Sequence, residues 1–462
     1  MKPVRNLLLL SLIVLLFACT KESFTNDSSA LLTTSVDTLH FDTVFTSTGS
    51  TSQFIKVLND NDKGVHISSV KLFGGSSSPY KINVDGTAGP QVNNIDVLAD
   101  DSVYIYVTVS INPSAANLPF LVRDSIEINY NGNKKIVQLD AYGKNAHFFR
   151  NKTIKTSEFW NDDLPYVILG GIIVDTNATL TINKGCRIYC HADAPFIING
   201  TLQVNGEKFD STRVIFTGDR LDEPYRDFPA SYPGLIFTDV SKNNIINYAV
   251  IKNAYQGIVV VEPSTGTKLT LNETIIDNAY DAGLIGINTS ITARNLLVSN
   301  CGKNILLVKG GNYNFTHCTA TTYSSNFIQH KEPVLVVTNY LNNTASNLNA
   351  IFRNCIFWGD ANGIVTDEAV VLKQGNTSFN VSFDQVLWRV ETNPANTTIN
   401  GAINNQDPLF DTINTAQKIY SFRLKANSPA IDKGISTSIN IDLDGKARPV
   451  GTKPDLGAYE KQ

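Results

Sequence analysis

Ile246-Asn247-Tyr248-Ala249-Val250-Ile251-Lys252-Asn253 is the stretch that decides the fold, because its pattern returns four more times along the chain. The matching octets begin at residues 271, 293, 315 and 352, so the offsets are 25, 22, 22 and 37 residues. Internal periods in this range are typical of repeat architectures. The apolar positions hold mainly β-branched, leucine and aromatic residues, which favours strands as the repeating unit.

The spacing of the apolar positions predicts where each coil bends. Positions one, four and six of the octet are mostly apolar, so the spacing changes from three to two. A straight strand would then turn its side chains to the opposite face, whereas a bend keeps them inside. The bend falls on position three, and position eight marks a second bend in three octets. The two groups are Tyr248, Glu273, Asn295, His317 and Asn354 for the first bend, and Asn253, Asn278 and Asn300 for the second.

Two bends and three short strands in each coil describe a parallel β-helix. Successive coils of such a helix lie about 4.8 Å apart. Equivalent residues should therefore stack, with Cys318 over Cys355 inside the helix and Asn278 beside Asn300 at the second bend. Asparagines at matching corners can form ladders of amide hydrogen bonds.

Several segments resemble right-handed parallel β-helix proteins with a pectin-lyase-like fold. The early segments 178–185, 200–206 and 214–217 resemble the opening coils of bacterial members. The end of the chain resembles the closing segment of secreted Bacteroidetes β-helix proteins, through Ser428-Pro429-Ala430-Ile431-Asp432-Lys433-Gly434, Asp442-Leu443-Asp444-Gly445-Lys446-Ala447-Arg448-Pro449 and Pro454-Asp455-Leu456-Gly457-Ala458-Tyr459-Glu460. We therefore expect an all-β protein with a right-handed parallel β-helix over residues 146–420 and a C-terminal capping segment over 421–462.

A separate β-sandwich is expected over residues 31–145. Val103, Ile105, Val107 and Val109 alternate with polar or aromatic residues, as in a strand with one buried face. The region resembles immunoglobulin-like domains of the ASH or Hydin type. It contains no catalytic cluster, so we interpret it as a spacer or a binding module.

The N-terminus carries the features of an export signal. Lys2 and Arg5 precede an apolar run over residues 7–18 that is too short to span a bilayer. The residues around Cys19 resemble a bacterial lipobox. The resemblance implies a signal peptide over 1–18, lipidation of Cys19, a flexible tether over 19–30, and an outer-membrane protein that a lipid anchor holds in the cell envelope, with surface exposure as one option.

The composition narrows the choice of partners. The chain of 462 residues has 42% hydrophobic residues and a formal net charge of −4. A mildly acidic chain lacks the basic field that nucleic-acid binding requires. Five cysteines follow Cys19, and an odd number cannot all pair, so we expect buried thiols. The partners that remain are a membrane, a polysaccharide or another envelope protein.

Catalytic residues are hard to assign. The carboxylate motifs of polygalacturonase-type β-helix hydrolases are absent. A polysaccharide lyase needs a Lys or Arg base, and the candidates near the bends are Arg294, Arg353, His317 and Lys252. The alternative is that these are isolated charges that keep the protein soluble. We expect no cofactor, although Asp442 and Asp444 resemble part of a calcium loop; a tight turn is the alternative interpretation.

One insert has the composition of a sugar-binding loop. Aromatic rings can stack on a pyranose while carboxylates bind its hydroxyl groups. The candidates are Tyr225, Arg226, Asp227, Phe228 and Tyr232, and the alternative is that the insert is a lid over an open coil.

An outward row of apolar residues, Val250, Ile275, Leu297 and Ile356, also needs a cover, which we expect from residues 326–349.

The sequence favours a non-catalytic envelope lipoprotein that binds an extracellular glycan or a partner surface, or is presented toward one. A polysaccharide lyase is the second hypothesis. An adhesin-like structural rod is the third.

Overall fold

The computed structural model describes residues 22–46, 49–112, 120–361 and 363–462, which form two compact units that divide between Asn145 and Ala146. The units are described separately. Among these residues, no helix is long and apolar enough to cross a membrane. The expected signal peptide over 1–18 and the lipidation of Cys19 lie outside the described residues.

The N-terminal unit is a sandwich of two sheets around one core. Alternate residues of paired strands, such as Ile55 and Val57 in β4 and Ile105 and Val107 in β9, have no exposed surface. The first sheet contains β1 (Phe24–Thr25), β3 (Thr38–Phe45), β5 (Gly64–Leu72), β8 (Gln91–Val97), β10 (Phe120–Tyr130) and β11 (Asn133–Lys144). The second contains β2 (Thr33–Thr34), β4 (Gln53–Asn59), β6 (Tyr80–Val84), β7 (Thr87–Ala88) and β9 (Asp101–Val109), and a short 3-10 helix, η1 (Gly75–Ser77), precedes β6.

The flexible tether expected over residues 19–30 is described in the structure from residue 22 onward, and this part is not a free linker. β1 pairs in parallel with β5 through Phe24 and Gly64, and Ala30 is buried in the core of the sandwich. Residues 22–30 therefore belong to the N-terminal unit, because Phe24 and Ala30 gain contacts there that a solvated linker would lack.

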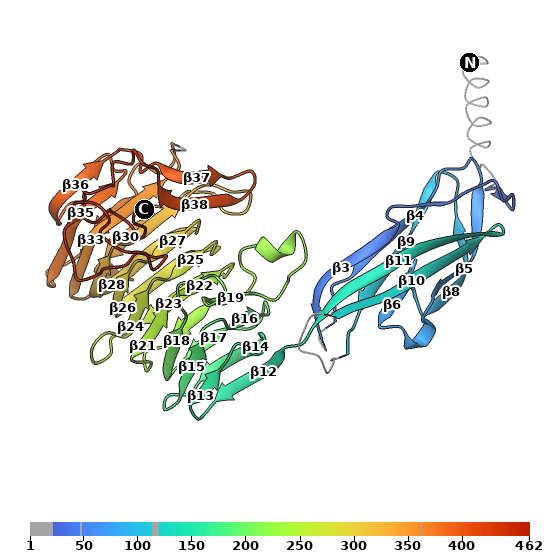
Figure 1. Ribbon diagram of the computed structural model, residues 1–462, viewed down its shortest axis with the longest axis horizontal. Helices are drawn as coiled ribbons and strands as arrows, with labels where there is room; N and C mark the ends of the chain where they lie inside the picture. Colours follow the sequence, from blue (N-terminus) through green and yellow to red (C-terminus); the bar gives the residue numbers. More distant parts are fainter. Residues whose placement is uncertain (1–21, 47–48, 113–119, 362) are drawn as a thin grey trace, which may run out of the picture. The chain divides into compact units, whose positions relative to one another are not determined.

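The second unit contains a right-handed parallel β-helix, as the sequence predicts. One parallel sheet of 23 strands runs from β12 to β36, and each strand pairs with a strand about one coil later (Figure 1). Parallel crossover connections are right-handed in nearly all proteins. The strands are β12 (His147–Ile154), β13 (Glu158–Trp160), β14 (Tyr166–Val174), β15 (Thr179–Asn183), β16 (Arg187–Cys190), β17 (Phe196–Ile198), β18 (Thr201–Asn205), β19 (Val214–Gly218), β20 (Leu235–Phe237), β21 (Asn244–Asn247), β22 (Ala249–Lys252), β23 (Gln256–Val261), β24 (Leu269–Asn272), β25 (Ile275–Asp277), β26 (Ala282–Arg294), β27 (Leu297–Ser299), β28 (Lys303–Thr316), β29 (Thr319–Thr322), β30 (Leu335–Thr338), β33 (Leu348–Gly359), β34 (Ala369–Leu372), β35 (Phe379–Trp388) and β36 (Thr398–Asn404).

Five short elements in the described part of this unit stand outside this sheet. The 3-10 helix η2 (Tyr225–Asp227) lies in the insert between β19 and β20. Two antiparallel pairs follow later in the chain, β31 (Tyr340–Leu341) with β32 (Thr344–Ala345), and β37 (Phe410–Asn414) with β38 (Ile419–Leu424).

Both predicted bends adopt the left-handed backbone conformation. At the first bend φ ranges from 46° at Tyr248 and Glu273 to 55° at His317 and Asn354. At the second bend φ is 65°, 56° and 51° at Asn253, Asn278 and Asn300. Asparagine tolerates this conformation better than most residues, which explains its repetition at the corners.

The predicted stacking is confirmed on both sides of the wall. Inside, Phe315, Phe352 and Phe383 form a continuous stack, with centroid distances of 5.4 and 5.1 Å. Cys318 and Cys355 directly precede Thr319 and Ile356, which are paired in register, and both are buried free thiols, as are the other three described cysteines. At the second bend, the amide of Asn278 donates to Asn253 Oδ1 at 2.8 Å. Asn278 and Asn300 line the same cavity, but the Asn300 amide donates to Asp277 Oδ1 at 3.3 Å rather than continuing the ladder to Asn278.

The C-terminal segment covers the flank of the coils. The outward row expected beneath residues 326–349 instead packs against this segment, because Leu297 and Ile356 share a buried cluster with Leu424, Leu443 and Leu456. Gly457 donates its backbone N–H to the Asn354 carbonyl of the first bend. The prediction for residues 326–349 was wrong, since this stretch supplies β30 to the next coil and then the β31–β32 hairpin.

Candidate functional site

A groove opens along the second bend of the β-helix. Its cavity measures about 130 Å³, less than the roughly 300–1,000 Å³ of typical small-molecule pockets. The groove is lined by Asp227, Lys252, Asn253, Asp277, Asn278, Asn300, Ser325, Phe327, Lys418 and Tyr420.

Lys252 and Asp277 place opposite charges at matching positions of adjacent coils. Lys252 ends β22 and is paired in register with Asp277 at the end of β25. Asp277 Oδ1 accepts hydrogen bonds from Ser299 Oγ at 2.6 Å and from Asn300 at 3.3 Å. Burial raises the pKa of Asp277 above its usual value, against the opposing effects of these bonds and of Lys252. The groove therefore offers a lysine beside a carboxyl group that takes up a proton more readily than an exposed aspartate.

The asparagines of the second bend fix one wall of the groove. Asn253 donates to the Arg226 carbonyl at 2.9 Å, and Asn278 donates to the Asp227 carbonyl at 3.0 Å. These bonds attach the insert that carries η2 to two successive coils. The corner residues thus set both the coil geometry and the position of the loop above it.

Aromatic rings from distant segments close the groove. Phe228 of the η2 insert packs on Phe327, with ring centroids 4.6 Å apart. The ammonium of Lys418 lies 4.8 Å from the centre of the Phe327 ring. Tyr420, in β38, lines the same cavity, and burial raises its pKa. A groove with aromatic faces, amides, two lysines and two carboxyl groups can bind a polar ligand that also has an apolar face.

The four lyase candidates do not meet at one place. Lys252 lines the groove, whereas Arg294, Arg353 and His317 lie at or beside the first bend. Arg294 pairs with the buried Glu273 at 3.1 Å, and Arg353 pairs with Asp384 at 3.1 Å.

His317 is buried between the first bend and the C-terminal segment. Its Nε2 lies 3.2 Å from Thr437 Oγ1 and 3.2 Å from the amide nitrogen of Asn354. Burial, together with the charge of Arg448, lowers the pKa of His317 to about 2. The imidazole is therefore neutral over the ordinary pH range and has no open face toward a ligand.

The five sugar-binding candidates of the η2 insert have different surroundings. The ring of Tyr225 is 43% exposed, but the Arg220 guanidinium lies over one face at 4.0 Å. Arg226 pairs with Glu223 at 2.6 Å. Only Asp227 lines the groove directly, with Phe228 behind Phe327. Tyr232 is buried in the core, so its ring cannot stack on a ligand.

The calcium candidates belong to the C-terminal segment. Asp442 is buried and accepts backbone hydrogen bonds from Asp444, Lys446 and Glu460. Asp444 forms an ion pair with Arg423 at 2.8 Å. These contacts are those of a tight turn. Within the described ranges, no group of three His, Cys, Asp or Glu side chains is placed to hold a metal ion.

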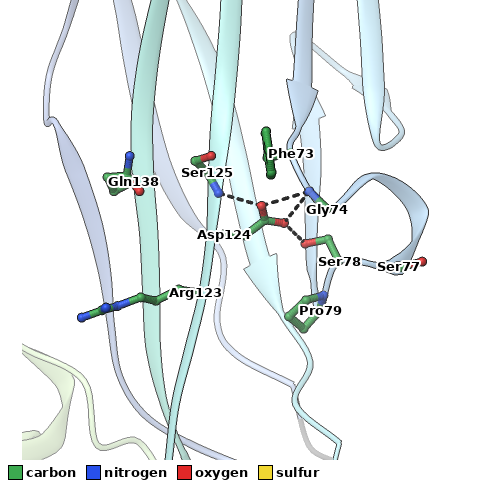
Figure 2. Close-up of a pocket in the computed structure, with 9 residues that line it drawn as sticks. All are labelled: Phe73, Gly74, Ser77, Ser78, Pro79, Arg123, Asp124, Ser125 and Gln138. Atoms are coloured by element: carbon green, nitrogen blue, oxygen red, sulfur yellow. Dashed lines mark hydrogen bonds between the residues drawn. The ribbon is translucent and has the colours of Figure 1, made fainter.

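A second pocket, of about 350 Å³, lies on the N-terminal unit. Figure 2 shows Asp124 at its centre, where the carboxylate accepts hydrogen bonds from Gly74 N, Ser78 Oγ and Ser125 N. A Cβ at Gly74 would lie 2.9 Å from the Asp124 carboxylate. Asp124 therefore braces the turn around η1, and its oxygens are already engaged.

Part of the groove was not identified from the sequence. Asp277 occupies the same octet position as Lys252 and could have been found by comparing that position between repeats. Lys418, Tyr420 and Phe327 lie outside the octets, and no local pattern connects them with the second bend.

Comparison with known proteins adds little to this description. No family model and no curated protein matches the chain. One similar solved structure is the pectate lyase Pel9A, with 16% identity, a TM-score of 0.27, and coverage of 65% of this chain and 89% of the other. Another is a family 123 glycoside hydrolase from Clostridium perfringens that acts on glycolipid glycans, with 14% identity and a TM-score of 0.19; the match spans 27% of this chain and only 26% of that one.

Proposed function

We propose that this protein is a lipid-anchored cell-envelope protein that binds an extracellular glycan in the groove without cleaving it. The observation that most supports this proposal is the composition of the groove, where aromatic rings, lysines, carboxyl groups and side-chain amides line one narrow cavity. Sugars need both kinds of contact, because a pyranose has an apolar face and a rim of hydroxyl groups. The rest of the glycan chain then lies outside the small cavity.

The N-terminal features support the anchor. A charged start, a short apolar run and Cys19 fit a lipoprotein signal, and lipidation of Cys19 would hold the protein at the outer membrane. The N-terminal sandwich, an immunoglobulin-like spacer in this proposal, would follow the anchor. A second envelope protein is a further partner that this arrangement permits.

A polysaccharide lyase is the second candidate function, and one observation favours it. Lys252 and Lys418 line the same groove, so one amine can act as a base while the other neutralises the carboxylate of an acidic sugar. Binding remains our conclusion because Arg294 and Arg353, the two arginine candidates for the base, pair with carboxylates outside the groove. A structural rod would not require the groove.

The test is a glycan array probed with the soluble chain that begins after Cys19, followed by an ultraviolet assay for unsaturated sugar products on every glycan bound. We expect binding without product. The matched variant is Lys252→Ala with Lys418→Ala, which should lose the binding of those glycans that occupy the groove while keeping the parent's melting temperature. Formation of unsaturated product would replace the proposal with the lyase function, and absence of any binding would reject both.

A further inference from the structure

The outer face of the second sheet of the sandwich carries three neighbouring aromatic rings. Phe54 in β4 is 50% exposed and Tyr106 in β9 is 45% exposed, while Tyr104, also in β9, is half-buried. Their neighbours along each strand point inward and already complete the core. Folding therefore does not require aromatic residues at these outer positions. We call Phe54, Tyr104 and Tyr106 the aromatic platform.

The strand register holds the three rings together. Phe54 is directly opposite Tyr106, and Lys56 is directly opposite Tyr104. The centroid of Phe54 lies 5.4 Å from Tyr104 and 6.3 Å from Tyr106, and the two tyrosine rings are 6.0 Å apart with an angle of 16° between their planes. The Phe54 ring is tilted by 54° and 61° to the two tyrosine rings, so the platform combines two nearly parallel rings with a third at an angle.

Two lysines and one aspartate lie close to the aromatic platform. The ammonium of Lys56 lies 5.0 Å from the centre of the Tyr104 ring, and Lys81 is exposed on the neighbouring strand β6. The other outward residues of β4, β6 and β9 are neutral, and they are Leu58, Asn83, Ser102 and Thr108. Asp85 follows β6 and donates its backbone N–H to the Tyr104 carbonyl at 3.1 Å, so one exposed carboxylate lies beside the two lysines. The lysines remain in excess at the rings, although the whole chain carries a formal charge of −4. The complementary ligand is an anion with apolar faces.

We infer that the aromatic platform is a second binding surface, separate from the groove, and that its ligand is an acidic polysaccharide. The rings stack against the apolar faces of successive sugar units, and Lys56 and Lys81 meet their carboxylates. An open sheet face suits an extended chain, whereas the groove of the other unit is a narrow cavity. Because the two surfaces are in different units, this inference does not depend on the proposed function of the groove.

The test is affinity electrophoresis of the whole soluble chain through gels that contain polygalacturonate, alginate or fully methyl-esterified polygalacturonate. The parent should be retarded by the two acidic polymers and much less by the ester, which has the same backbone without the charge. Phe54→Ala with Tyr106→Ala should raise the apparent Kd for polygalacturonate about tenfold, as expected for the loss of two aromatic contacts.

Two controls separate this surface from other effects. Tyr142→Ala removes a tyrosine that is 53% exposed on the other sheet of the same unit, and should leave retardation unchanged. Lys252→Ala weakens the groove alone, and the platform variant should lose the same retardation in this background as in the parent. Equal retardation of the parent and the platform variant at matched melting temperatures would overturn the inference. The inference would also be overturned if no acidic polymer retarded the parent, which is the result expected of a platform that binds only protein.

Discussion

The first and second bends of each coil share a backbone conformation and differ in what covers them. Both use left-handed residues that stack from coil to coil. At the first bend, Asn295 and Asn354 donate to the Ile441 and Ile435 carbonyls of the C-terminal segment. At the second bend, Asn253 and Asn278 bind an insert that leaves a groove open. The corner geometry therefore builds the helix, and the chain added at each corner decides whether the surface is structural or available to a ligand.

The largest effect is expected at the covered bend. Arg448 is fully buried, pairs with Glu460 at 2.9 Å and donates to Asn295 Oδ1 at 3.0 Å. Arg448→Ala leaves the carboxylate of Glu460 buried without its partner, which should lower the free energy of unfolding by about 3–5 kcal/mol. Chemical denaturation measures this change.

Arg423→Ala is the matched control for Arg448. It removes an arginine whose side chain is 49% exposed and pairs with Asp444 in the same segment. The expected cost is about 1 kcal/mol or less, because solvent screens an exposed pair. Equal losses for the two variants would contradict the view that the first bend is a buried structural interface.

Two buried histidines should give opposite pH dependences. The pKa of His317, at the first bend, is lowered to about 2 by burial and by Arg448. Burial also acts to lower the pKa of His330, but hydrogen bonds to Asp360 and Glu368 outweigh it and raise the pKa to about 9. His330 follows Ser325 and Phe327 in the segment that lines the groove.

The direction of each pH dependence follows from comparing the folded pKa with the histidine pKa of 6.5 in the unfolded chain. The contribution of His317 is complete above this value and is lost as the pH falls below it. The contribution of His330 is complete below this value and is lost as the pH rises toward about 9. Unfolding free energies at about pH 5, 7 and 9 should show that His317→Asn flattens the acid side and His330→Gln the alkaline side. The reverse assignment would contradict these environments.

A smaller effect is expected from the ladder of the second bend. Asn278→Ala removes the hydrogen bonds to Asn253 and Asp227 and places alanine at φ 56°. We expect a loss of about 1–3 kcal/mol and faster proteolysis within residues 219–232. Asn288→Ala, at φ 47° with a bond to Glu262, makes the same change away from this insert. Equally fast cleavage of the insert in both variants would show that Asn278 does not hold it.

The same comparison shows how far the sequence could predict the molecule. The coils, both bends and the stacked interior follow from the octet, because each coil repeats the same local requirement. The cover of the first bend was missed because the segment that contains Leu443 and Leu456 has no strand periodicity. The groove was only partly found, since Lys418 and Tyr420 come from a hairpin far along the chain from Lys252. The ion pair between Arg294 and Glu273 was also missed, because it forms between adjacent coils. Both residues belong to the aligned octets, so comparing neighbouring repeats could have identified it.

The most direct test compares one cation from each bend. Calorimetric titration uses the soluble chain with Phe54→Ala and Tyr106→Ala, which leaves the groove as the binding site, and an acidic oligosaccharide that the glycan array identifies. Adding Lys252→Ala should give about tenfold weaker binding, the loss expected from one charged contact. Arg294→Ala should match the parent, because this arginine pairs with Glu273 beside the covered bend. Unchanged binding for Lys252→Ala together with a loss for Arg294→Ala would place the ligand at the first bend and contradict the account.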